Sequence, residues 1–93
     1  MNKLTVFYLK GCPYCRNAER AFRELEAELP AFSADRIEWI EERRNAEIAD
    51  RYDYYRVPSV FLGTQKLYEC SPSHDYAAIK QNLRRAVETL FLI

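Results

Sequence analysis

The sequence predicts an α/β protein with the element order βαβαββα and a four-stranded mixed sheet flanked by helices. In the first half of the chain, short apolar runs alternate with amphipathic helical repeats, which is typical of parallel strands joined by helices. Two later apolar runs are separated only by Gly63-Thr64, which predicts an antiparallel hairpin with a glycine-first turn. The chain has 93 residues, and we expect residues 1–93 to form one domain because this length leaves no room for a second core.

The first strand is predicted over residues 3–9, where apolar side chains on both faces favour a central position in the sheet. Gly11 ends this strand. Pro13 then stands in the first turn of a helix, where its missing N–H leaves no hydrogen bond unmade. Pro30 ends that helix, whose apolar residues recur at helical spacing: Ala18, Ala21, Phe22, Leu25 and Leu29.

A second strand is predicted over residues 36–41, followed by a short helix from residue 46 to about residue 52 with Asn45 as its N-cap. The hairpin strands are predicted over residues 59–62 and 65–70. We expect Ser71-Pro72-Ser73 to supply the cap and the first turn of the last helix. Its inward stripe is Tyr76, Ile79, Leu83, Val87 and Leu90.

Composition excludes several classes of function. Apolar residues make up 48% and charged residues 30% of the chain, and the formal net charge is zero, so no charged footprint for nucleic acid or an acidic membrane surface is expected. No apolar stretch approaches the roughly 20 residues of a membrane span. Three cysteines do not form a secreted disulfide framework. We therefore expect a cytoplasmic monomer.

The run Cys12-Pro13-Tyr14-Cys15 lies between the first strand and the first helix. The free N–H groups and the positive end of the dipole at a helix start favour a thiolate at the first cysteine. The second cysteine follows about one turn later. It is close enough to attack a mixed disulfide on the first, so the motif predicts a redox-active dithiol.

These residues resemble the thioredoxin superfamily, and most closely its glutaredoxin branch. The run from Cys12 to Cys15 is identical to the dithiol glutaredoxin motif, and Val57-Pro58 falls where that family has a valine and a cis-proline. The resemblance implies a thioredoxin fold and a thiol–disulfide oxidoreductase that reduces disulfides of proteins or small molecules. Cys12 would be the nucleophile and Cys15 the resolving thiol, with no bound cofactor.

The resemblance also implies a substrate surface around the dithiol. Tyr14 would offer an apolar surface beside the dithiol, and a cis-Pro58 would leave the Val57 backbone free to pair with an extended substrate. The substrate-binding group expected from sequence is Lys10, Pro13, Tyr14, Arg56, Val57, Pro58, Glu69 and Cys70.

The chain departs from the glutaredoxin pattern at three places. Arg56 stands where the family usually has threonine, and Lys10 lies two residues before the first cysteine rather than three. The end of the fourth strand reads Tyr68-Glu69-Cys70-Ser71, where the family has Gly-Gly and then often Cys-Asp. We expect poor affinity for glutathione, because side chains replace the glycines and one is a carboxylate. Arg56 can still pair with a carboxylate of glutathione, so the expected electron donor is glutathione or a thioredoxin-reductase-like enzyme.

The residues also allow a function of another class. Cys12, Cys15, Cys70 and His74 are four ligands of the type that zinc binds tetrahedrally, which would make the chain a non-catalytic binding or zinc-binding module. Cys70 alone has two interpretations, as a part-buried strand residue or as a third thiol that traps or regulates. The tyrosines at positions 52, 54 and 55 would either cover the second helix and third strand or form an interaction surface.

Overall fold

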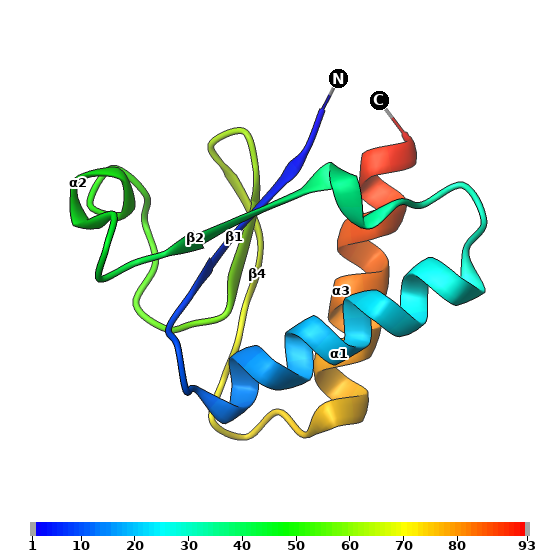
Figure 1. Ribbon diagram of the computed structural model, residues 1–93, viewed down its shortest axis with the longest axis horizontal. Helices are drawn as coiled ribbons and strands as arrows, with labels where there is room; N and C mark the ends of the chain where they lie inside the picture. The colour runs from blue at the N-terminus through cyan, green and yellow to red at the C-terminus, as the bar shows by residue number, and fades with distance from the viewer. Residues whose placement is uncertain (1, 93) are drawn as a thin grey trace.

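The computed structural model of this protein describes residues 2–92 and contains a four-stranded mixed sheet in the order β2-β1-β3-β4 (Figure 1). Strand β1 pairs in parallel with β2 and antiparallel with β3, and β3 pairs antiparallel with β4. The predicted order and sheet are therefore confirmed. The elements are β1 (Leu4–Tyr8), α1 (Pro13–Glu28), a 3₁₀ helix η1 (Ala34–Arg36), β2 (Ile37–Glu41), α2 (Ala46–Ala49), β3 (Ser59–Leu62), β4 (Gln65–Glu69) and α3 (Tyr76–Phe91).

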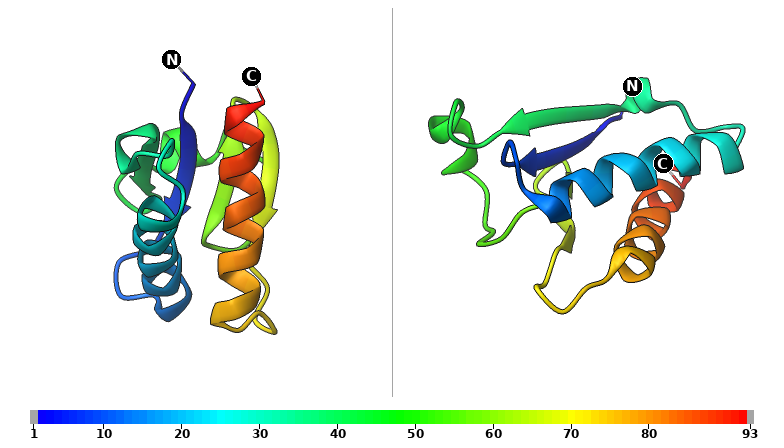
Figure 2. Two further views of the ribbon diagram at one scale, coloured as in Figure 1. Left: turned by 90° about the vertical axis from the view of Figure 1, so that its right-hand side faces the viewer. Right: turned by 60° about the horizontal axis from the view of Figure 1, so that its bottom comes forward.

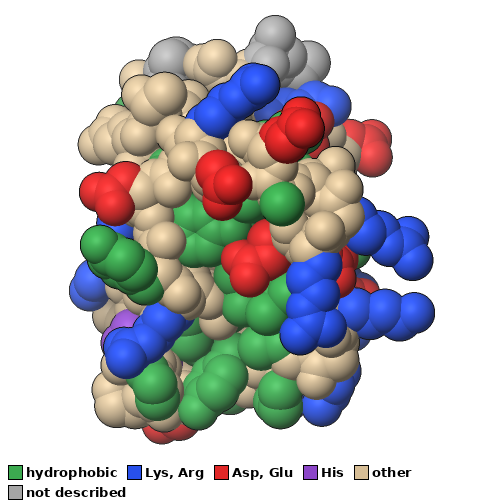
Figure 3. All heavy atoms as spheres, turned by 90° about the vertical axis from the view of Figure 1, so that its left-hand side faces the viewer, with side chains coloured by type: hydrophobic (Ala, Val, Ile, Leu, Met, Phe, Trp, Pro, Cys, Tyr) green, Lys and Arg blue, Asp and Glu red, His purple; other side chains and the backbone are tan. Residues whose placement is uncertain are grey.

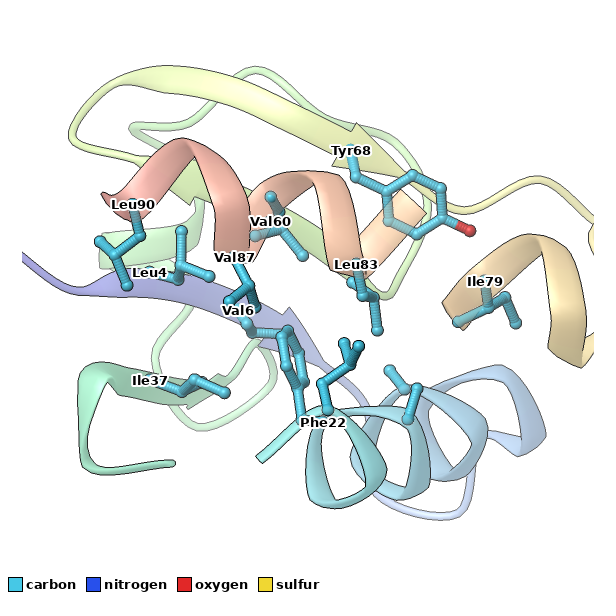
Figure 4. Packing of buried hydrophobic residues seen from close by; sticks show 14 of the residues in the cluster. Leu4, Val6, Phe22, Ile37, Val60, Tyr68, Ile79, Leu83, Val87 and Leu90 are labelled. Atoms are coloured by element: carbon cyan, nitrogen blue, oxygen red, sulfur yellow. The ribbon is translucent and has the colours of Figure 1, made fainter. Parts of the chain in front are cut away.

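Helices α1 and α3 cover one face of the sheet and enclose the larger core (Figures 2 and 4). Leu4 and Val6 point from β1 into this core and are fully buried, as are Leu83 and Val87 of α3. Burying one such side chain contributes about 1.5–3 kcal/mol. The helical stripes read from the sequence thus fix α1, and with it the dithiol at its start, against the sheet.

The other face of the sheet carries a smaller aromatic cluster. Phe7 points to this side of β1, and Phe61 of β3 packs against it with ring centroids 5.8 Å apart. Tyr52 and Tyr54 lie 4.7 and 4.9 Å from the Phe7 ring. These two tyrosines cover the sheet, whereas Tyr55 is 90% exposed and is not part of this cluster.

The start of the last helix was predicted wrongly. The N-cap of α3 is Asp75, whose carboxylate accepts a hydrogen bond of 2.8 Å from the backbone N–H of Ala78. Ser71-Pro72-Ser73 instead forms a turn in which the Ser71 hydroxyl accepts from the Ser73 N–H at 3.3 Å. Both stretches contain good cap residues, and the aspartate lies at the position where the helical stripe begins.

The second helix and the fourth strand are also shorter than predicted. Helix α2 ends at Ala49 rather than near residue 52, because Tyr52 and Tyr54 leave the helical path to pack on Phe7. Asn45 precedes α2 as predicted, but its side chain donates to the Glu41 carbonyl at 3.0 Å rather than capping the helix. Strand β4 ends at Glu69, one residue before the predicted end.

The hairpin turn at Gly63-Thr64 is confirmed. Leu62 pairs with Gln65, and Gly63 has a φ of +60°, a backbone conformation that favours glycine. A shift of register between Val60 and Phe61 marks a β-bulge in this hairpin, which the sequence did not predict. Within residues 2–92 no helix has both the length and the apolar character needed to cross a bilayer.

Candidate active site

The dithiol lies on the turn between β1 and α1. Gly11 has a φ of +85°, which lets the chain reverse, and the Cys12 N–H donates to the Leu9 carbonyl at 3.2 Å. Cys12 is the N-cap of α1 and Pro13 its first residue. The Arg16 guanidinium donates to the Gly11 carbonyl at 3.1 Å and braces the turn. Cys12 therefore lies at the positive end of the helix dipole, as the sequence predicted.

The two thiols of the motif differ in burial. Cys12 is half-buried, whereas Cys15 is 5% exposed, and both are free thiols. Burial is the main reason that the pKa of the Cys15 thiol rises to about 12. The neighbouring Cys12 raises it further, and a hydrogen bond from the Leu9 backbone opposes the shift. This difference in burial suits Cys12 as the attacking thiol and Cys15 as the shielded one.

A groove of about 300 Å³ lies beside the dithiol. The peptide bond between Val57 and Pro58 is cis, as the resemblance predicted. The Tyr14 hydroxyl donates to the Pro72 carbonyl at 3.1 Å, which ties the start of α1 to the loop after β4. The groove is lined by Leu9, Tyr14, Glu42, Tyr55, Arg56, Val57, Cys70, Ser71 and Pro72. Figure 3 shows this end of the molecule at its lower part, where apolar side chains gather beside Lys and Arg side chains.

The Val57 backbone is available to a substrate. Among the residues that the structure describes, no protein group forms a hydrogen bond with its N–H or its C=O. The next residue is held in place, since the Pro58 carbonyl accepts from the Cys70 N–H at 3.0 Å. A backbone without hydrogen-bond partners, at a groove and next to a fixed proline, can receive one strand of an extended peptide.

Cys70 borders the groove but is 3% exposed. Burial raises the pKa of its thiol, and a negative charge on Cys12 raises it too, whereas a hydrogen bond from Tyr68 opposes the shift. The structure thus brings a third thiol within electrostatic reach of the dithiol, and leaves its role as trap or regulator a prediction.

A second cavity, of about 510 Å³, lies on the β2 side of the dithiol. Lys10, Arg16 and Trp39 line it together with both cysteines of the motif. The backbone N–H of Lys10 lies 3.4 Å from the Glu41 carboxylate, so the end of β2 holds this loop in place. Lys10 therefore lies on the opposite side of the dithiol from Arg56, and whether either contacts substrate stays a prediction.

The four-ligand set proposed for zinc is not assembled. The Nδ1 atom of His74 lies 2.8 Å from the Tyr68 hydroxyl and 3.3 Å from the Ser71 N–H. Within residues 2–92, no group of three or more His, Cys, Asp or Glu side chains is arranged to hold a metal ion. His74 is a structural partner of Tyr68 here.

The Glu69 carboxylate does not line the groove. One oxygen accepts from the backbone N–H groups of Tyr55 and Arg56 at 3.1 and 2.9 Å, and the other lies 2.8 Å from the Lys66 ammonium. The sequence offered no signal for these contacts, because they join residues 13 and 14 positions apart. Four further residues of the groove were not predicted from sequence, because each lies there through the path of a loop: Leu9, Glu42, Ser71 and Pro72.

The fold and this site together define a thioredoxin-fold protein with a two-cysteine site at the start of its first helix. The family model described as Glutaredoxin matches residues 4–67, which include the dithiol and the cis-proline. The chain belongs to the glutaredoxin family. This membership supports a role in thiol–disulfide exchange. The match ends before Tyr68-Glu69, where the sequence departs from the family pattern, and a search of the curated proteins finds no match to this chain.

Proposed function

We propose that this protein is a dithiol oxidoreductase that reduces disulfides carried by extended polypeptides in the cytoplasm. The observation that carries the proposal is the arrangement of the three parts of the site. Half-buried Cys12 is the N-cap residue of α1, and buried Cys15 follows one turn later. Tyr14, which lies between the two cysteines in sequence, lines a groove together with Val57, the residue before the cis-proline.

The reaction consists of two thiol–disulfide exchanges. The Cys12 thiolate attacks one sulfur of the substrate disulfide, forms a mixed disulfide and releases the other substrate sulfur as a thiolate. Cys15 then loses its proton and attacks the Cys12 sulfur, which releases the second substrate thiolate to take up that proton. The substrate gains two electrons and the protein becomes a Cys12–Cys15 disulfide, which an external dithiol or two monothiols must reduce again.

The pKa of Cys15 provides a reason for this order. Burial raises the pKa most, and Cys12 adds to the shift through a hydrogen bond and through its charge. Both contributions of Cys12 weaken when its sulfur enters the mixed disulfide, because that sulfur then carries no negative charge and is a poor acceptor for the Cys15 S–H. The pKa of Cys15 therefore falls at the step that needs its thiolate. In the reduced protein before reaction, Cys15 stays protonated.

The groove supports a polypeptide substrate better than glutathione. Tyr14 and Val57 provide apolar and backbone contacts for an extended chain, and the Arg56 side chain offers a cation beside them. The glycines that admit glutathione in this family are replaced by Tyr68 and Glu69. Weak use of glutathione follows, and a thioredoxin-reductase-like enzyme is the donor that we propose.

The test is reduction of the oxidised protein by two donor systems in parallel, glutathione with its reductase and a thioredoxin reductase with NADPH, each coupled to a polypeptide disulfide such as insulin. We expect turnover with the reductase, slow turnover with glutathione, and none with Cys12→Ser. A Cys70→Ser variant tests the third thiol: the two exchanges use only Cys12 and Cys15, so it should keep turnover, and a loss of turnover would give Cys70 a part in the reaction. Failure of the wild type with both donors contradicts the proposal.

A further inference from the structure

Glu69 joins the end of β4 to the loop that precedes the cis-proline. Its carboxylate accepts two hydrogen bonds from consecutive backbone N–H groups, those of Tyr55 and Arg56. It also pairs with Lys66, and the Glu69 side chain is 19% exposed. Partial burial raises the pKa of this carboxyl, but the bonds from Lys66 and the two amides outweigh that effect, and the net shift is downward. The charged carboxylate is thus the form that the site stabilises.

The Tyr54 side chain anchors the loop through its contact with Phe7 and a hydrogen bond of 2.7 Å to Glu42, but the backbone has few other hydrogen bonds near this point. Within the described residues, the N–H groups of Asp53, Tyr54 and Val57 have no protein acceptor, and the Arg56 carbonyl accepts from the Ser59 hydroxyl. Hydrogen bonds to a charged acceptor are shorter and stronger than neutral ones. The two bonds to Glu69 therefore hold the stretch that leads directly into Val57 and the cis peptide bond.

We propose that Glu69 is a positioning residue that fixes the Tyr55–Arg56 segment, so that the Val57 backbone and the Arg56 side chain meet an extended polypeptide in one orientation. This inference rests on the proposed function. The glycines that the family has at this place cannot make these contacts, because they have no side chain. A carboxylate in place of glycine thus orders the backbone that would meet an extended substrate.

A preordered loop lowers the entropic cost of binding and leaves the chemistry at Cys12 unchanged. Glu69→Ala should therefore raise KM for a polypeptide disulfide about tenfold or more, with kcat within about twofold of wild type. Reduction of bis(2-hydroxyethyl) disulfide, which has no peptide backbone to pair with Val57, should keep its kcat/KM. Glu69→Gln keeps one oxygen acceptor, so its KM for the polypeptide disulfide should lie between those of the wild type and Glu69→Ala.

The matched control is Lys66→Met, which removes the ion pair but leaves both amide bonds to Glu69. Its KM should stay within about twofold of wild type, since the Lys66 end of the ion pair reaches solvent and such surface pairs contribute little. Hydrogen exchange of the Tyr55 and Arg56 amides gives a readout independent of activity. These amides should exchange slowly in wild type and Lys66→Met, and fast in Glu69→Ala.

Each outcome decides the proposal. Unchanged amide exchange in Glu69→Ala would show that the carboxylate does not hold the loop. Faster exchange with an unchanged KM, or an equal loss on both disulfides, would show that the loop does not position the substrate. If the wild type reduces neither disulfide, the proposed function fails and takes the substrate role of Glu69 with it, while the exchange data still decide whether Glu69 holds the loop.

Discussion

Cys15 should be almost unreactive in the reduced protein at neutral pH, although it lies one helical turn from the reactive cysteine. Its thiol has a pKa of about 12 because it is buried. A pH of about 7 is about five units below this pKa, so Cys15 is a thiolate in only about one molecule in 10⁵. The thiolate fraction rises tenfold with each pH unit, and the alkylation rate of Cys15 should rise about 100-fold between about pH 7 and pH 9.

The assay is pulsed alkylation with iodoacetamide, followed by mass spectrometry of peptides that contain each cysteine. Cys12 should be labelled first, because it is half-exposed at the start of α1. Cys12→Ser should speed the labelling of Cys15, since Cys12 contributes to the raised pKa of Cys15. Protein unfolded in urea is the control for intrinsic reactivity. Labelling of Cys15 in the folded protein at the unfolded rate near pH 7 would refute the burial argument.

Three further predictions concern stability. Asp75→Ala should lower the free energy of unfolding by about 1 kcal/mol, because α3 loses its N-cap. The control Ser73→Ala should change this free energy by a few tenths of a kcal/mol at most. Equal effects of the two variants in urea unfolding would contradict the assignment of Asp75 as the cap. Gly11→Ala should lower the free energy of unfolding by about 1–2 kcal/mol, because alanine is strained at a φ of +85°. The added Cβ would meet no other atom, so strain is the only expected cause. An unchanged midpoint of urea unfolding would argue against that φ. Hydrogen bonds from Tyr76 and Lys80 lower the pKa of Glu24 from 4.5 to about 2. The stability that Glu24 contributes is therefore present above about pH 4.5 and is lost as pH falls through about 2. Glu24→Gln should be less stable than wild type near neutral pH and about as stable near pH 2. A difference in stability that does not change with pH would contradict this reasoning.

The elements whose residues repeat at a regular spacing were predictable from sequence. The stripe of α1 and the Gly63-Thr64 turn each follow from local patterns, and the structure has both. The errors fall where distant packing competes with local preference. Helix α2 stops early because Tyr52 and Tyr54 bind the Phe7 ring on β1, a partner that no local pattern reveals.

The site follows the same division. The place of Cys12 and Cys15 on the β1–α1 turn could be predicted because strand, glycine and proline are neighbours in sequence. The contacts of Glu69 could not be predicted from sequence, because a carboxylate at that position suggested only repulsion of an anionic ligand. Its hydrogen bonds to Tyr55 and Arg56 depend on how the hairpin lies beside the loop, which the spacing of residues does not determine.

The most direct test of the oxidoreductase account uses Cys15→Ser, which can form the mixed disulfide but cannot resolve it. The variant is mixed with an excess of insulin or another polypeptide disulfide, quenched with acid and analysed by mass spectrometry without reductant. The account predicts a stable covalent adduct linked through Cys12 and absent from Cys12→Ser. An adduct through Cys70, or none at all in a variant whose fold is intact, would contradict it.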